Sequence, residues 1–323
     1  EDLGVEAAWR ALDTPGTRLW VDLGEEPPEV TRPLLLDLFG FHPLAVEDAL
    51  QEAQHVPRVD DWEDYLYLVL HGLLPDGQGP NGEIPVSPYS LVTLEVDVFL
   101  GERYLVTHWV RRIAAMERMW ANCRRDERCL ARGTSALLYQ LADEIVDDFM
   151  PVVDEFDEAL DQVEREVFGR PAPAFLGRVF ALKRAQLHMR RLITPQREML
   201  NKLARGDYEL IAADDRVFFR DVYDHLVRLY EITEAQRDAT AGIVDTYLSA
   251  VNNRMNEVIK ALTLVTTLFL PLSFLASFFG MNFFAAAAPT PAWTSPVVLV
   301  IVVLLMLAIP VIMYGWMRRR AWM

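Results

Sequence analysis

Two long apolar runs without a charged residue dominate the C-terminal part of the chain. They cover residues 261–279 (ALTLVTTLFLPLSFLASFF) and residues 296–317 (PVVLVIVVLLMLAIPVIMYGWM). As an α-helix, each run is long enough to cross about 30 Å of hydrocarbon, because a helix rises about 1.5 Å per residue. The pattern therefore predicts two transmembrane helices in succession, and a buried helical hairpin in a soluble core is the alternative.

Basic residues flank these runs on one side only. Arg318 to Arg320 follow the second run, Arg254 and Lys260 precede the first, and residues 280–295 between them contain no Lys or Arg. By the positive-inside rule, we expect a protein of the cytoplasmic membrane with both termini in the cytoplasm and the connecting loop outside.

The first 110 residues alternate between strand-like and helix-like patterns. Strands are predicted at 18–23, 65–73, 90–100 and 104–110, and helices at 34–39 and 43–53. This part is expected to form a small mixed layer of strands and helices.

From residue 111 onward the pattern is helical. Helices are predicted at 134–168, at 173–205, and from about residue 214 to Gly280, the last of these about 100 Å long. The predicted fold class is an α+β/α membrane protein. It would comprise a cytoplasmic α/β domain (1–132), a cytoplasmic stalk of very long helices (133–257) and a two-helix transmembrane domain (258–323) with an outer loop at 280–295.

The last predicted helix carries polar residues at steps of three, four and seven. They are Asp245, Asn252, Asn256, Thr263, Thr266, Ser273 and Ser277. Inside a membrane such a stripe indicates either hydrogen bonds between helices or a wet face. One helix cannot enclose a pore, so a wet face requires several copies of the chain around an axis.

The charge balance favours cations as partners. The chain has 47 acidic and 31 basic residues, a net charge of −16, which argues against nucleic-acid binding. Eleven of the acids lie between Asp143 and Glu166, where they form either a solvated helix face or a surface that concentrates cations. Cys123 and Cys129 lack a zinc-site spacing and are interpreted as two ordinary thiols on one helix in a reducing compartment.

No motif of an enzyme is found. The chain lacks a P-loop, a metal-hydrolase motif and a recognisable nucleophile–base pair, so we expect a protein that is not an enzyme. A membrane-anchored enzyme and a membrane-anchored metal sensor that conducts nothing remain the alternatives to a transporter.

Gly280, Met281 and Asn282 follow the first apolar run directly. Glycine ends a helix and lets backbone carbonyls turn inward, and asparagine adds a neutral oxygen acceptor. Mg2+ prefers oxygen ligands and gives up its water slowly, so a ring of such oxygens suits a hydrated divalent ion. As a bare tripeptide the motif is weak.

Its surroundings make the motif specific. Residues 250–263 (AVNNRMNEVIKALT), 271–274 (PLSF) and 279–283 (FGMNF), together with FRDVYDH at 219–225 and the tail from Arg318 to Trp322, closely resemble the CorA family of magnesium and cobalt transporters. The resemblance runs from about residue 30 to the end of the chain. It implies a funnel-shaped homopentamer in the lipid bilayer, with no nucleic acid and no small-molecule substrate beyond metal ions.

The resemblance also implies roles for individual residues. The selectivity filter would be Gly280, Met281 and Asn282. The pore would be lined by Asp245, Asn256, Ile259, Leu262, Thr266, Leu270, Ser273 and Ser277. Of these, Ile259, Leu262 and Leu270 would form an apolar constriction that gates by dewetting. Asp245 would form an acidic ring at the inner end.

Cytoplasmic metal would bind between subunits and hold the pore closed. The matching acids are Asp221, Asp60 and Asp61, with Asp143 as a further ligand. A bound Mg2+ would offset the repulsion between these carboxylates, and its loss would loosen the ring.

One departure from the family pattern concerns the choice of ion. Members usually carry a Met-Pro-Glu-Leu motif in the outer loop, whereas here residues 283–293 (FFAAAAPTPAW) contain no acid. The expected cargo is Mg2+, and also Co2+. A Zn2+ or Ni2+ transporter of the same architecture, driven by protons, is the alternative.

Overall fold

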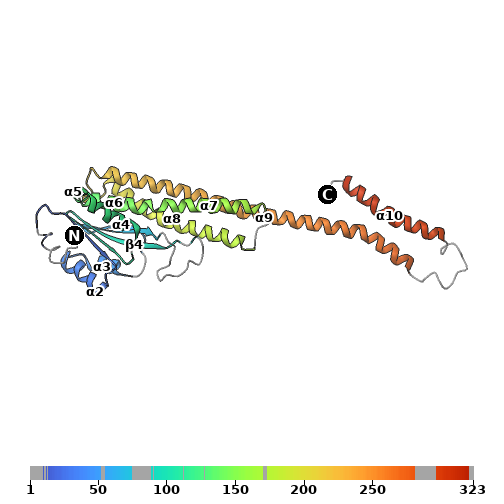
Figure 1. The fold of residues 1–323 in the computed structure, drawn as a ribbon, viewed down its shortest axis with the longest axis horizontal. Coiled ribbons are helices and arrows are strands. Elements are labelled where there is room, and N and C mark those ends of the chain that lie inside the picture. The colour runs from blue at the N-terminus through green and yellow to red at the C-terminus, as the bar shows by residue number, and fades with distance from the viewer. Residues whose placement is uncertain are drawn as a thin grey trace. The chain divides into compact units, whose positions relative to one another are not determined.

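The computed structural model describes residues 10, 12, 14–51, 55–74, 89, 91–111, 113–126, 128–169, 173–280 and 296–319. The chain divides into two units, Glu1–Val244 and Asp245–Met323, and one helix continues through the boundary. Figure 1 shows the ribbon of both.

A five-stranded sheet forms the centre of the first unit. Its strands are β1 (Leu19–Gly24), β2 (Arg58–Asp61), β3 (Tyr65–Leu73), β4 (Thr93–Gly101) and β5 (Tyr104–Trp109), in the order β1-β5-β4-β3-β2. Only β1 and β5 pair in parallel. All nine residues of β3 are buried, as expected for a strand covered on both faces.

An apolar cluster covers one face of this sheet. Tyr67 and Phe99 of the sheet pack there with Leu35, Phe41 and Val46. The latter three come from the segment that holds α2 (Pro28–Pro33), a π-helix (Leu34–Leu38) and α3 (Pro43–Leu50). Figure 1 shows α2 and α3 together on one side of the strands.

The four predicted strands are confirmed, and β2 was not predicted. It has only four residues, Arg-Val-Asp-Asp, none of them buried, so it shows neither an apolar run nor a clear alternation. Its backbone pairs antiparallel with β3, and helix α8 packs along this edge. Tertiary contacts rather than its own pattern define this strand.

The helices of the first unit follow the sheet. They are α4 (Ala114–Arg125), α5 (Arg128–Ala131), α6 (Thr134–Asp147), α7 (Phe149–Val167), α8 (Phe175–Arg205) and α9 (Arg216–Gly280). The predicted helices at 173–205 and from 214 to Gly280 are confirmed. Gly206 ends α8 with φ +76°, in the left-handed conformation that glycine adopts without strain.

The prediction of one helix at 134–168 is wrong, because the helix is interrupted at Asp148. Pro151 has no N–H to donate to the carbonyl of Asp147, so the ladder of helical hydrogen bonds cannot continue through this point. Because the apolar three-to-four spacing continues on both sides of the break, the spacing alone does not predict it.

The prediction for the two cysteines is also wrong. Helix α4 ends at Arg125, and Asp126 has an extended backbone (φ −133°, ψ 103°) that turns the chain toward α5. Cys123 and Cys129 therefore lie on different helices, with a Cα–Cα distance of 5.4 Å, and form a disulfide. Six residues of continuous helix would have held them apart.

Helix α9 buries a regular stripe in the first unit. Its buried residues are Phe219, Val222, Leu226, Leu229, Thr233, Gln236, Thr240 and Ile243. Steps of three and four alternate along this stripe, which is the seam pattern of helices packed side by side. The stripe ends at Ile243, next to the boundary of the unit.

The second unit contains the rest of α9 and helix α10 (Pro296–Arg319). Both are long and apolar enough to cross a membrane, and their most apolar windows are 0% and 6% buried. Large side chains such as Phe269 and Val311 are 61% and 71% exposed. A soluble hairpin core would bury these residues, so the pattern favours lipid-facing helices.

Candidate metal centre and pore helix

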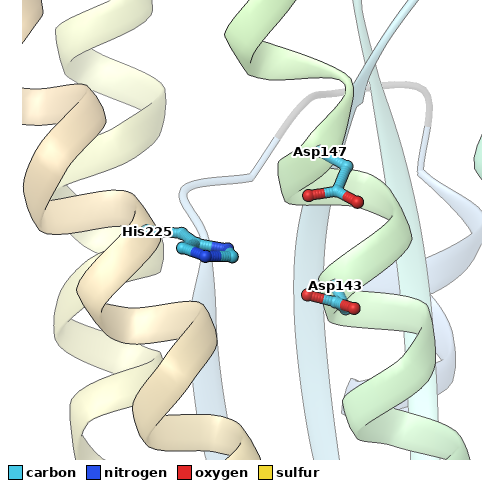
Figure 2. Close-up of side chains that lie close together, drawn as sticks. All are labelled: Asp143, Asp147 and His225. Carbon is cyan, nitrogen blue, oxygen red and sulfur yellow. The ribbon is translucent and has the colours of Figure 1, made fainter.

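Three potential metal ligands meet between α6 and α9. The carboxylates of Asp143 and Asp147 and the imidazole of His225 each offer one atom, and these atoms lie within 4.8 Å of one another. Figure 2 shows the two carboxylates on one helix and the histidine on the facing helix. Asp143 is half-buried, and the other two side chains are exposed.

The positions of these acids follow from the helix period. Asp143 and Asp147 are four residues apart, so both point from the same side of α6. Glu144 and Asp148 lie one residue further along and turn toward α4, where Arg118 forms ion pairs with both. Its Nη2 is 2.8 Å from Asp148 Oδ1.

The acids that face α9 have no such cation. Neither Asp143 nor Asp147 forms an ion pair with an Arg or Lys in the described part of the chain. The pKa of Asp143 is raised, first by burial and then by the negative charges of Asp147 and Asp221, although His225 opposes this shift. A divalent cation between the two helices would relieve this repulsion.

Asp221 belongs to the same neighbourhood. It lies one turn before His225 on α9, and its charge raises the pKa of both Asp143 and Tyr139, for which burial is the largest cause. The structure therefore brings together two of the four predicted metal residues, Asp143 and Asp221.

The other two predicted residues have different partners. Asp60 forms an ion pair with Arg58 (2.8 Å), and Asp61 accepts a hydrogen bond from the backbone N–H of Glu63 (3.0 Å). Both lie on β2, and the structure does not bring them to the cluster on α6 and α9. Their part in a site between subunits stays a prediction.

Sequence reasoning missed Asp147 and His225 as ligands. In the sequence, Asp147 is one of eleven acids between Asp143 and Glu166, and His225 is the last residue of FRDVYDH at 219–225, so neither stands out as a ligand. A signal was present, because Asp143/Asp147 and Asp221/His225 are both pairs with a spacing of four. Two such pairs on neighbouring helices place four potential ligands opposite one another.

In the second unit, every described residue predicted to line the pore is exposed on α9. In an ideal helix the eight residues predicted to line the pore, from Asp245 to Ser277, occupy an arc of about 120° of the circumference. Gly280 is the last residue of the helix. Met281, Asn282 and the loop up to residue 295 lie outside the described residues, as do Arg320 and Trp322.

This face of α9 carries both apolar and polar levels. Leu262 and Leu270 are 65% and 69% exposed, and Thr266 lies one turn from each. The Thr266 hydroxyl donates a hydrogen bond to the carbonyl of Leu262 (2.8 Å), so its oxygen presents only lone pairs outward. Such an oxygen can accept a hydrogen bond from the water shell of a cation.

Comparison with known proteins identifies the family of the chain. The family model described as "CorA-like Mg2+ transporter protein" matches residues 16–319. The cobalt/magnesium transport protein CorA of Thermotoga maritima is 35% identical over 291 residues, which cover 89% of this chain and 78% of that relative. The zinc transport protein ZntB of Yersinia pseudotuberculosis is 22% identical over 281 residues, covering 87% and 81%.

Among solved structures, the CorA magnesium transporter from Methanocaldococcus jannaschii has the same fold. The TM-score is 0.80 at 20% sequence identity, and the match covers 100% of this chain and 94% of that chain. The shared architecture is an N-terminal soluble domain, a long helix that leaves it, and C-terminal apolar helices. These findings make the two apolar helices those of a membrane protein.

Proposed function

This chain belongs to the CorA-like Mg2+ transporter family, a family of divalent cation transporters, and from that membership we propose that it forms a homopentameric Mg2+ channel of the cytoplasmic membrane. Both termini would be cytoplasmic. The observation that carries the proposal is the exposed face of α9, on which polar levels such as Thr266 and Ser273 lie beside the apolar levels Leu262 and Leu270.

In this proposal each part of the pore face has one task. Gly280, Met281 and Asn282 hold the hydrated ion at the outer mouth through oxygen atoms. Five copies of Leu262 and Leu270 close the pore by excluding water, and Thr266 offers a wet level between them. Asp245 attracts cations at the inner end.

The cluster on α6 and α9 supports a regulatory role for cytoplasmic Mg2+. Asp143, Asp147 and Asp221 carry negative charge that no Arg or Lys of the described residues neutralises by an ion pair. Mg2+ would hold α6 and α9 together and favour the closed pore, and Asp60 and Asp61 of a neighbouring subunit would complete the site. Release of the ion restores repulsion and favours opening.

Uptake into proteoliposomes at a defined membrane potential tests the transport proposal. We expect saturable Mg2+ entry that Co2+ inhibits and that a pH gradient does not change. If the correctly assembled protein takes up neither Mg2+ nor Co2+, the transport proposal is contradicted. Chemical cross-linking in detergent should trap five subunits, and a ladder that stops at two would refute a five-fold pore.

A second candidate cargo rests on His225. Imidazole is a preferred ligand of Zn2+, Ni2+ and Co2+, whereas Mg2+ prefers oxygen alone. A histidine beside two carboxylates therefore fits a transition metal better than Mg2+. The outer loop, which lacks an acid, also differs from the usual family pattern. Uptake of Zn2+ or Ni2+ that requires a pH gradient would favour this candidate.

Replacing both Asp143 and Asp147 by Asn is expected to remove most of the stabilisation by Mg2+. A ligand at 100 times its Kd raises the free energy of unfolding by about 2.7 kcal/mol, and the variant loses the carboxylates that bind it. Thermal unfolding with and without Mg2+ measures this difference. The control is Asp154→Asn, an exposed acid on α7. An equal loss in this control would mean that Mg2+ acts on overall charge only.

His225→Gln is expected to separate the two classes of ion. The change removes an imidazole but no carboxylate. The affinity for Zn2+, Ni2+ or Co2+ should therefore fall about tenfold or more, while the stabilisation by Mg2+ stays the same. Titrations of unfolding temperature with each ion give the comparison. A parallel loss for Mg2+ would show that His225 supports the helices rather than binding metal.

A further inference from the structure

A second site lies in the first unit, beside the β2 edge of the sheet. A cavity of about 520 Å3 opens between the segment before β2, strand β3 and helix α8. Five nitrogen-bearing side chains line it: His55, His71, Arg184, His188 and Arg191. None of them belongs to the metal cluster or the pore helix. The volume is in the range of pockets that bind small molecules.

The charge of this cavity is opposite to that of the chain. Arg184, His188 and Arg191 are spaced by four and three residues, so they share one side of α8. Both arginines are exposed, and neither forms an ion pair with any described carboxylate. Two guanidinium groups without a counter-ion on a protein with net charge −16 require an explanation.

His71 points to a ligand independently of the arginines. It is only 5% exposed, and neither ring nitrogen has a hydrogen-bond partner among the described residues. The nearest carboxylate oxygen, Glu95 Oε2, is 4.0 Å from Nε2. An unpaired buried polar group is costly, so a small shift of this imidazole toward the cavity, where a ligand atom could pair with it, would be favourable.

His55 is held in place by Glu95. Its backbone N–H donates to Glu95 Oε2 (2.6 Å), and its Nδ1 is 3.0 Å from Glu95 Oε1. Both carboxylate oxygens are thereby engaged, so Glu95 orients the imidazole of His55 at the cavity. A second carboxylate, Asp48, lies 3.9 Å from His55 Nε2 and forms an ion pair with Arg58. The described residues that line the cavity itself include no acid and two guanidinium groups, those of Arg184 and Arg191.

We propose that this cavity binds a phosphate-bearing small molecule of nucleotide size. Arginine forks match the oxygens of a phosphate group, and the imidazoles add further donors. The aliphatic residues of the cavity, Val56, Leu187 and Leu192, supply apolar contact for the remainder of the ligand. The inference is independent of which ion the chain carries.

A transition metal is the competing occupant, since histidines and Glu95 are metal ligands in other proteins. Among the described residues, however, the only group of three whose ligand atoms all lie within 4.8 Å of one another is Asp143, Asp147 and His225. The two arginines would also repel a cation at this place. The arrangement therefore favours an anion.

Equilibrium binding to the full-length protein in detergent tests the proposal. The probes are AMP, inorganic phosphate and adenosine, all without divalent metal. We expect saturable binding of AMP at one site per subunit, weaker binding of inorganic phosphate, and none of adenosine. Arg184→Gln with Arg191→Gln should weaken AMP binding by about 100-fold, since each charge-assisted contact contributes about tenfold or more.

The matched control is Lys183→Gln with Lys202→Gln, which removes two positive charges from the same helix outside the cavity. This control should bind AMP as the parent does. A measurement on the unaltered chain adds a second check: AMP should protect Arg184 and Arg191 from a dicarbonyl reagent that modifies guanidinium groups.

Three results would overturn the assignment. The first is the absence of saturable AMP binding together with unprotected arginines. The second is equal weakening in the lysine control, which would show that only overall charge matters. The third is tight binding of Zn2+ alone that His71→Leu abolishes and the arginine variant leaves intact, which would make the cavity a metal site.

Discussion

Asn282→Ala is expected to abolish selective uptake of divalent ions while the protein still assembles in the membrane. The proposal places the Asn282 amide oxygen in a ring around the hydrated ion, and alanine offers no oxygen in its place. Mg2+ gives up its water slowly, so recognition depends on acceptors for the hydrogen atoms of that shell. A loss of about 1.5 kcal/mol or more per contact, repeated around a five-fold ring, leaves almost no selective binding.

The control for this variant is Asn253→Ala. It makes the same chemical change on helix α9, at a position outside the polar stripe. Radioactive or fluorescence-detected uptake is compared at equal amounts of cross-linked pentamer. Unchanged Mg2+ uptake by Asn282→Ala would remove the outer mouth from the mechanism, whatever the family resemblance.

Leu262→Asn is expected to make the pore conduct when cytoplasmic Mg2+ should keep it closed. Leu262 is 65% exposed on α9, on the face that is predicted to line the pore, and would form one apolar level of the gate. Five amide groups at this level bind water, so the barrier to wetting falls. A reduction of only 1.4 kcal/mol raises the rate about tenfold, and a ring of five changes should exceed this.

Uptake at high internal Mg2+ measures the effect, with Leu262→Met as the apolar control. The methionine variant keeps a dry constriction and should remain inhibited. If the asparagine variant is also inhibited, the gate lies at another level of the helix. An equal leak in both variants would indicate that any change at this position disturbs packing.

The long-range organisation of the fold was accessible from the sequence because strong patterns specify it. Charge-free runs marked the helices of the second unit, and the three-to-four spacing marked α8 and the stripe of α9. Short elements were not accessible. Strand β2 depends on pairing with β3, and the break at Asp148 depends on one proline within an otherwise regular pattern.

The candidate sites divide in the same way. Asp143 and Asp221 were predicted from resemblance. The spacing of four relates Asp147 to Asp143, but only the fold shows that both face His225 while Glu144 and Asp148 pair with Arg118. The cavity at Arg184 and His71 joins residues more than 100 positions apart, which no local pattern relates. Sequence alone indicates which residues are polar, whereas the fold decides which of them meet.

The uninterrupted course of α9 has a mechanical consequence. His225 and Ile259 belong to the same helix, 34 residues apart, and no loop separates them. A hydrogen-bonded helix passes a rotation about its own axis from one turn to the next. If the proposed metal site and gate are both correct, a helix-breaking insertion between these residues should uncouple metal binding from conduction.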